Sequence, residues 1–65
     1  MRRLAADMRS WRAVYRVTQD RAAGELGVST KTWQRWEREE TDPHPGHVYW
    51  LAALIAGPPP WWSRD

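Results

Sequence analysis

A run of polar side chains that can bind nucleic acid lies between residues 30 and 38. Lys31 and Arg35 are four residues apart, so in a helix their side chains lie on one face. Each can reach the O6 and N7 atoms of guanine or a phosphate oxygen. The Thr and Gln side chains of this run can also hydrogen-bond to base edges. These side chains are therefore able to bind base edges and phosphates.

The charges of the chain are unevenly distributed, which also favours a polyanionic partner. Residues 1–38 carry nine Lys and Arg residues against four acidic residues, whereas residues 39–65 carry one Arg against four acidic residues. The net charge is +2 and the isoelectric point is about 9.7. A basic surface of this kind attracts nucleic acid. A solvated helix rich in Arg accounts for the same charge pattern, so charge alone does not decide between the two interpretations.

The sequence contains no recognisable arrangement of residues for catalysis or metal binding. It has no Cys, which excludes disulfides and Cys-based zinc sites and fits a reducing compartment. His44 and His47 lie near Asp42 but lack a third strong ligand, so we interpret them as loop residues. No Gly-rich phosphate loop, nucleophile elbow or pair of catalytic carboxylates is present in the sequence. We therefore predict no enzyme activity, no metal, no cofactor and no small-molecule substrate.

The spacing of apolar residues predicts four short helices and no strand. Leu4, Met8, Trp11 and Tyr15 recur every three or four residues, which is the stripe of an amphipathic helix. Residues 42–47 predict a loop, since two Pro and one Gly interrupt regular structure. The expected helices span residues 2–15, 19–26, 30–38 and 47–56.

The second and third of these helices have the features of a tight helix–turn–helix. Thr18 and Ser29 are suitable N-cap residues, and Gly27 suits the left-handed backbone that follows a helix. Trp33 and Trp36 share one face, and we interpret them as core residues rather than as stacking platforms for single-stranded bases.

One hydrophobic core is expected within a domain over residues 1–57, followed by a Pro- and Trp-rich tail over residues 58–65. The longest apolar run covers residues 48–56, well short of the roughly 20 residues of a membrane helix, so we expect no membrane association. The expected core residues are Leu4, Met8, Trp11, Tyr15, Ala22, Leu26, Val28, Trp33, Trp36, Leu51 and Leu54.

The segment from Thr18 to Glu37 reads TQDRAAGELGVSTKTWQRWE, with Arg12 before it and a Pro-containing loop and an apolar helix after it. This pattern resembles the Cro/repressor-type (XRE-like) helix-turn-helix DNA-binding proteins of phages and bacteria. The resemblance covers about residues 8–56. It implies an all-α, lambda-repressor-like fold of four helices with a short Pro/Trp C-terminal tail.

The resemblance also implies roles for individual residues. The Gln that touches a DNA phosphate in the family maps to Gln19, and the first turns of the third helix read bases. Arg12 and Glu37 occupy the positions of an ion pair between the first and third helices. The DNA-binding residues expected on this basis are Gln19, Thr30, Lys31, Thr32, Gln34, Arg35 and Arg38.

The chain departs from the family pattern just after the third helix. Glu39 stands where the family commonly has Gly, and Glu40 and Asp42 stand where a Lys or Arg usually meets the DNA backbone. Each acid near a phosphate weakens binding by about 1 kcal/mol at low salt. This departure puts the loop contacts in question but not those of the helix.

The function implied is that of a sequence-specific, double-stranded DNA-binding regulator of transcription in the bacterial cytoplasm. It resembles a phage or mobile-element repressor, which places its third helix in the major groove of an operator that overlaps a promoter. The alternative is a protein-interaction module on the same fold, such as an antitoxin-like or host-protein-binding factor. The acidic residues 39–42 and the Trp-rich tail favour this alternative.

A homodimer on a palindromic operator is also expected, because one recognition helix reads only a few base pairs. Trp61 and Trp62 are the candidate anchors of the dimer interface, with Trp50 behind them. In the competing arrangement, the tail folds back onto its own domain and the protein dimerises only on DNA.

Overall fold

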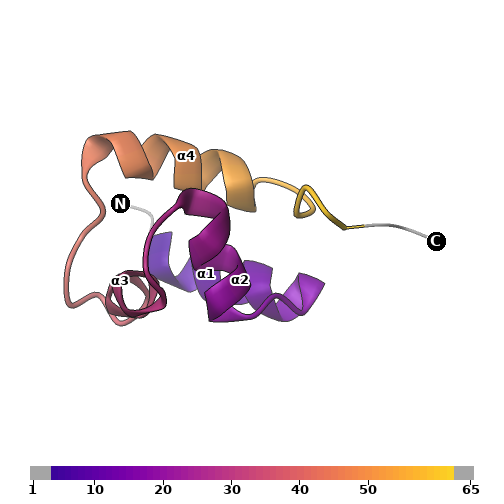
Figure 1. Cartoon of the computed structure of the whole chain (residues 1–65), viewed down its shortest axis with the longest axis horizontal. Coiled ribbons are helices and arrows are strands. Elements are labelled where there is room, and N and C mark those ends of the chain that lie inside the picture. The colour runs from indigo at the N-terminus through magenta and orange to yellow at the C-terminus, as the bar shows by residue number, and fades with distance from the viewer. Residues whose placement is uncertain (1–3, 63–65) are drawn as a thin grey trace.

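The computed structural model describes residues 4–62, which form four helices and no strand (Figure 1). The helices are α1 (Leu4–Tyr15), α2 (Gln19–Leu26), α3 (Thr30–Glu37) and α4 (Pro45–Ile55). α1 packs against α3 and α4, and α2 packs against the same two helices. In Figure 1, α4 runs along the top of the view and α3 lies at the lower left. The predicted all-α class with four helices is confirmed.

Side-chain caps begin α2 and α3 where the sequence predicts them. The hydroxyl of Thr18 accepts a hydrogen bond from the backbone N–H of Arg21 at 3.1 Å. The hydroxyl of Ser29 accepts one from the N–H of Thr32, also at 3.1 Å. Because each cap satisfies an N–H that has no partner within its helix, it contributes about 1 kcal/mol.

The start of α4 differs from the prediction. The helix begins at Pro45, two residues before the predicted start at His47, and His44 is its N-cap without a side-chain hydrogen bond. The first residue of a helix has no intrahelical use for its N–H, and the φ of Pro already suits the helix. Pro45 therefore initiates α4 instead of prolonging the loop.

Gly27 ends α2 in the left-handed backbone conformation, with φ of 72°. Its N–H donates to the carbonyl of Gly24 at 3.1 Å, and the N–H of Val28 donates to the carbonyl of Ala23 at 3.0 Å. These two bonds form a Schellman motif, which satisfies the last carbonyls of the helix and turns the chain towards α3. The Gly27 prediction is confirmed.

Two other helices end in the same way without a Gly. Arg16, after α1, has φ of 56°, and Glu39, after α3, has φ of 61°. After α3, the N–H of Glu40 donates to the carbonyl of Arg35 at 3.0 Å, as the motif requires. A side chain in this conformation costs about 1 kcal/mol relative to Gly, so Glu39 is a strained position.

The core lies between the four helices and contains large aromatic side chains. Trp33, Met8 and Leu51 are the largest fully buried side chains. Every expected core residue is either buried or packed against the buried cluster. Val17 is buried as well, although its β-branched side chain reads in the sequence as an interruption of the helix pattern. Val17 comes directly after Arg16, whose left-handed backbone conformation changes the direction of the chain at this point.

The described part of the tail folds back onto its own domain. The indole N–H of Trp11 donates to the carbonyl of Gly57 at 2.7 Å, and Pro59 is buried. The guanidinium of Arg21 lies 4.2 Å from the ring centre of Trp61, and Trp62 meets Tyr15 edge-on at 5.5 Å. This is the competing arrangement considered for the tail, and a role of these two Trp residues in a dimer stays a prediction.

The strained end of α3 yields a first prediction. Replacing Glu39 by Gly is expected to raise the free energy of unfolding by up to about 1 kcal/mol, because Gly adopts a positive φ without a steric penalty and the interaction lost with the exposed Glu39 side chain is worth less. For a domain of this size, the melting temperature should rise by up to about 4–8 °C.

The matched control is Glu40→Gly, which removes an acid from the neighbouring position, where φ is not positive. It should leave stability unchanged or lower it. Equal stabilisation by both variants, measured by urea and thermal unfolding, would show that charge rather than backbone strain is responsible.

Candidate nucleic-acid interface

The two faces of α3 have opposite characters. Trp33 and Trp36 are 0% and 6% exposed, so one face is embedded in the core. Lys31, Arg35 and Arg38 are exposed, and their spacing of four and three residues places them in one outward stripe. The interpretation of the two Trp residues as core is therefore confirmed, and α3 presents a row of cations to solvent.

Two of these cations have no partner within the described part of the chain. Lys31 and Arg35 form no hydrogen bond or ion pair with any of residues 4–62. A cation without an internal partner can bind an external anion without first breaking an ion pair. Lys31 and Arg35 are thus the strongest candidates for contacts to phosphate or guanine.

Arg38 differs from Lys31 and Arg35, because it forms an ion pair with Glu40 of the following loop. Its guanidinium lies 3.2 Å from a carboxylate oxygen of Glu40, and both side chains are largely exposed. An ion pair in this setting is worth little, about 0–1 kcal/mol. It nevertheless reduces the charge that Arg38 offers to another anion.

The hydroxyl groups at the start of α3 are bound internally. Thr30 donates to a carboxylate oxygen of Asp20 at 2.6 Å, which links the first turn of α3 to that of α2. Ser29 donates to the hydroxyl oxygen of Thr32 at 2.9 Å. The link to Asp20 places an acid beside the predicted base-reading residues. In the sequence, Asp20 reads only as a surface charge favoured near a helix N-terminus.

The two Gln residues join each other rather than pointing apart. The amide nitrogen of Gln34 donates to the side-chain oxygen of Gln19 at 3.0 Å. The amide nitrogen of Gln19 in turn donates to Glu37 at 3.0 Å. Gln19 therefore bridges α2 and α3. Its contact to a DNA phosphate stays a prediction, and only the second N–H of its amide group is left to make that contact.

Glu37 is the centre of this network. Its side chain is only 4% exposed, and its two oxygens accept from Arg12 at 2.6 and 2.9 Å. The indole N–H of Trp33 donates to the same carboxylate at 2.5 Å. The structure brings together the predicted pair of Arg12 and Glu37 in a bidentate geometry, which fixes distance and orientation at once.

A second Arg of α1 also reaches the end of α3. Arg9 donates to the backbone carbonyl of Glu37, and Arg12 additionally donates to the carbonyl of Val17 at 3.3 Å. Arg9 was not among the predicted site residues, because a single sequence shows it only as one charge on a solvated helix face. The bond from Arg9 ties α1 directly to the C-terminal end of α3, whereas the bond from Arg12 to Val17 stays within α1 and the turn that follows it.

The surroundings of Glu37 keep its carboxylate ionised. Burial alone raises the pKa of this carboxyl, but hydrogen bonds from Arg12, Gln19 and Trp33, together with the charge of Arg12, outweigh it and lower the pKa from its ordinary value of 4.5. The folded state thus favours the charged form. The resulting stabilisation is present above the ordinary pKa and is lost as pH falls through the lowered one.

The two His residues lie together at the start of α4. Their ring centres are 4.7 Å apart, and the ring of His47 also lies 5.4 Å from that of Trp36. Within residues 4–62, no three His, Cys, Asp or Glu side chains form a group that could hold a metal ion. Packing of His47 on Trp36 helps to connect α4 to α3.

Comparisons of the chain with protein-family models, curated proteins and solved structures found no significant match. None of the described helices is long and apolar enough to cross a membrane. Function must therefore be inferred from the geometry and chemistry of α2, α3 and their supports.

The Glu37 network yields a second prediction. Arg12→Met and Glu37→Gln should each lower the free energy of unfolding by about 2–4 kcal/mol, because each leaves a charged or polar partner unsatisfied. The double variant should lose less than the two losses combined. Urea unfolding at pH 7, with an osmolyte added to keep weak variants folded, measures this coupling.

Measuring the same two single variants and the double variant at low pH tests whether the coupling comes from the charge of Glu37. The coupling should fade as pH drops below the lowered pKa of Glu37, since the protonated carboxyl no longer attracts Arg12. Glu25→Gln, which changes an exposed carboxylate on α2, is the control and should unfold like the parent. Additive losses at pH 7 would contradict the pairing.

Proposed function

We propose that this chain is a sequence-specific, double-stranded DNA-binding regulator of transcription of the Cro/repressor helix-turn-helix type. In this proposal α2 and α3 form the helix-turn-helix, and α3 lies in the major groove. The observation that carries the proposal is the outward face of α3, where Lys31 and Arg35 are exposed and without a partner among residues 4–62. A major groove admits one α-helix, and these side chains can bind the O6 and N7 atoms of guanine or phosphate oxygens.

The way in which α3 is held supports this proposal. Its inner face is anchored by two buried Trp side chains, and its C-terminal end is bonded to α1 through Glu37. A recognition element that is already ordered loses little conformational entropy when it binds. The cations of α3 therefore project from a fixed helix, which suits the reading of base edges more than a mobile basic segment does.

The hydrogen bonds within the site indicate a different role for each predicted DNA-binding residue. Lys31 and Arg35, which have no partner in the described part of the chain, would contact DNA directly, whereas the Thr30 hydroxyl is already used as a donor to Asp20. Thr30, Thr32 and Gln34 would contribute through their remaining lone pairs or methyl groups, the latter against a thymine methyl. Gln19 and Arg38 would contact phosphates, which position the helix but carry no sequence information.

The regulatory consequence follows from occupancy of the DNA. A domain of this size bound over a promoter excludes polymerase sterically, as expected for a phage or mobile-element repressor acting in the bacterial cytoplasm. One such module buries too little DNA surface for tight specific binding, so a homodimer on a palindromic operator completes the proposal.

The third prediction concerns Arg35. Duplex sites selected from random DNA should bind the parent with an affinity that falls steeply between about 50 and 200 mM salt. If Arg35 contacts a phosphate, Arg35→Ala should weaken binding to all sites alike and reduce the salt slope by about 1. If it contacts guanine, the variant should relax preference at one position at a cost of about 1–3 kcal/mol.

Arg16→Gly is the matched control, because it removes one positive charge at the end of α1 and places Gly at a positive φ. It should leave both the salt slope and the preferred site unchanged. Equal binding of the parent to every duplex would contradict sequence-specific recognition. Absence of duplex binding at low salt would favour a protein-interaction module instead.

The fourth prediction concerns the loop acid that pairs with Arg38. Glu40→Gln should tighten DNA binding about fivefold at low salt, because it releases Arg38 and removes one repulsive charge. The gain should shrink as salt screens these charges. In an Arg38→Met background the same substitution should give a smaller gain, and an equal gain would exclude a role for the ion pair.

A further inference from the structure

The sequence of α4 contains no Asp, Glu, Lys or Arg over residues 45–55. Its inner side packs on the core through Leu51, which is fully buried. A helix that is apolar on all sides is normally covered on all sides. Here the outer side is open, because Tyr49 is 80% exposed and Trp50 is 68% exposed.

All exposed large apolar side chains within residues 4–62 lie on α1, α4 or the tail, and none lies on α2 or α3. The apolar surface and the cations of α3 thus occupy different elements. Scattered exposed apolar residues are normal, but a continuous apolar patch marks an interaction surface. A partner that covers α4 would leave the cationic face of α3 accessible.

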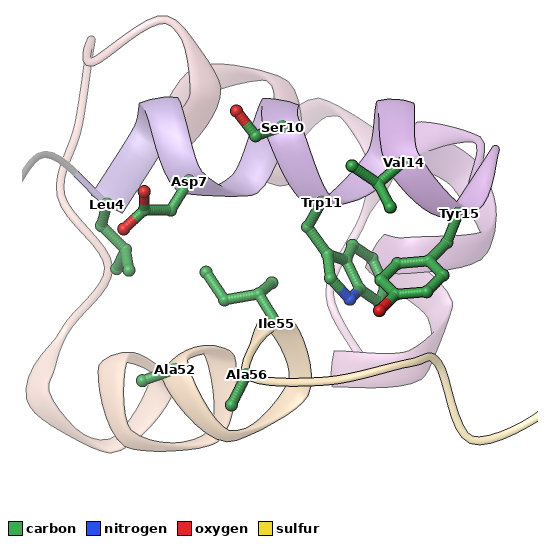
Figure 2. A pocket seen from close by; sticks show the side chains of 9 residues that line it. All are labelled: Leu4, Asp7, Ser10, Trp11, Val14, Tyr15, Ala52, Ile55 and Ala56. Carbon is green, nitrogen blue, oxygen red and sulfur yellow. The ribbon is translucent and has the colours of Figure 1, made fainter.

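A groove between α1 and α4 adjoins this apolar surface and is lined by both apolar and polar side chains (Figure 2). It has a volume of about 640 Å³. Leu4, Trp11 and Val14 line it from α1 together with the polar Asp7 and Ser10, and Ala52, Ile55 and Ala56 line it from the other side. Ala52 and Ala56 belong both to the groove and to the exposed face of α4, so the two features form one surface.

The size of the side chains on the outer face of α4 changes along the helix. The exposed side chains of the N-terminal half include the large Val48, Tyr49 and Trp50, whereas the exposed residues towards the C-terminal end are the small Ala52, Ala53 and the C-cap Ala56, with Leu54 and Ile55 only partly exposed. Tyr49 precedes Ala52 and Ala53 by three and four residues, and Ala56 follows them by four and three, so these four positions share one stripe. A large residue at one end and small residues at the other make the stripe complementary to its own reversed copy.

We infer that a second copy of this chain covers α4, with the two α4 helices packed antiparallel about a two-fold axis between Ala52 and Ala53. This arrangement places Tyr49 of each protomer opposite Ala56 of its partner and beside the mouth of the partner's groove. The two protomers then present the same patch to each other, as a two-fold interface requires. No charged side chain of α4 is buried by this contact.

A parallel arrangement lacks this complementarity, because it sets Tyr49 against Tyr49 and leaves the alanines facing one another across a gap. The tail Trp residues are less suitable anchors than α4. Trp61 is already covered by Arg21, and the ring of Trp62 packs on Tyr15. The inference does not rest on DNA binding, since it concerns self-association of the free protein.

The absence of Cys from the chain allows a direct test by cross-linking. In the inferred dimer, the two copies of residue 53 lie about 1.5 Å apart along the helix axes, whereas the two copies of residue 56 lie about 10 Å apart. Under mild oxidation, Ala53→Cys should therefore form a disulfide-linked dimer in high yield. Ala56→Cys, an equally small change on the same stripe, should remain largely uncrosslinked.

Three outcomes would overturn the inference. Equal cross-linking of both variants would indicate a parallel or non-specific contact, and cross-linking that depends on Trp62, tested with Ala53→Cys/Trp62→Ser, would indicate the tail. Absence of cross-linking in both variants, with the parent sedimenting as a monomer up to high micromolar concentration, would exclude a dimer through α4.

Sedimentation of the unmodified and Tyr49→Ser proteins gives an independent measurement. Tyr49 is mostly exposed, so its replacement should leave folding intact while raising the dimer dissociation constant by about tenfold or more. Both experiments are done without DNA. A protein that dimerises in this way but binds no duplex would contradict the proposed function and leave this inference standing. A protein that selects duplex sites but does not associate through α4 would overturn this inference and leave DNA recognition standing.

Discussion

The carboxylate of Glu37 holds the domain together at the point where three helices meet. It accepts hydrogen bonds from Arg12 of α1, Gln19 of α2 and Trp33 of α3 itself. A buried carboxylate is costly unless charged and polar partners surround it. Here every partner comes from a different part of the chain, so the network is satisfied only when the helices adopt one mutual orientation.

That orientation determines what α3 presents to solvent. The bonds at Glu37 and the packing of Trp33 and Trp36 fix the inner face of the helix. The outer face then follows from the geometry of a helix, which places Lys31 and Arg35 on the opposite side. A small domain gains specificity from such a polar network because an apolar core of the same size tolerates more than one packing angle.

Two acidic residues near α3 reduce the attraction of its outer surface for anions. Asp20 holds the hydroxyl of Thr30, and Glu40 holds the guanidinium of Arg38. Both reduce the non-specific attraction of a polyanion, which comes mainly from unscreened positive charge. If α3 binds DNA, the remaining affinity depends more on the contacts of Lys31 and Arg35, and base contacts are the ones that distinguish sequences.

Apolar surface is in excess elsewhere, and this excess has a simple origin. A chain of 65 residues has a large surface relative to its volume, so it cannot bury all of its six Trp and two Tyr side chains in one core. The core accommodates Trp11, Trp33 and Trp36. Trp61 and Trp62 cover the flank of α1 and α2, whereas Tyr49 and Trp50 stay outside on α4.

The sequence by itself determined the features that depend on neighbouring residues. The caps at Thr18 and Ser29, the turn at Gly27 and the inward positions of the core follow from local hydrogen bonding and from helical periodicity. The pair of Arg12 and Glu37 came from the family resemblance, since nothing local connects residues so far apart in the chain. The start of α4 differs from the prediction, because Pro45 begins a helix instead of preventing one.

The tertiary structure alone decided which polar groups remain free. The bonds from Thr30 to Asp20, from Gln34 to Gln19 and from Arg38 to Glu40 all join side chains that the sequence shows only as separate polar residues. The position of the tail on α1 and α2 is of the same kind. Such contacts depend on the angles at which helices pack and on the rotamers of long side chains, and no local pattern encodes either of these.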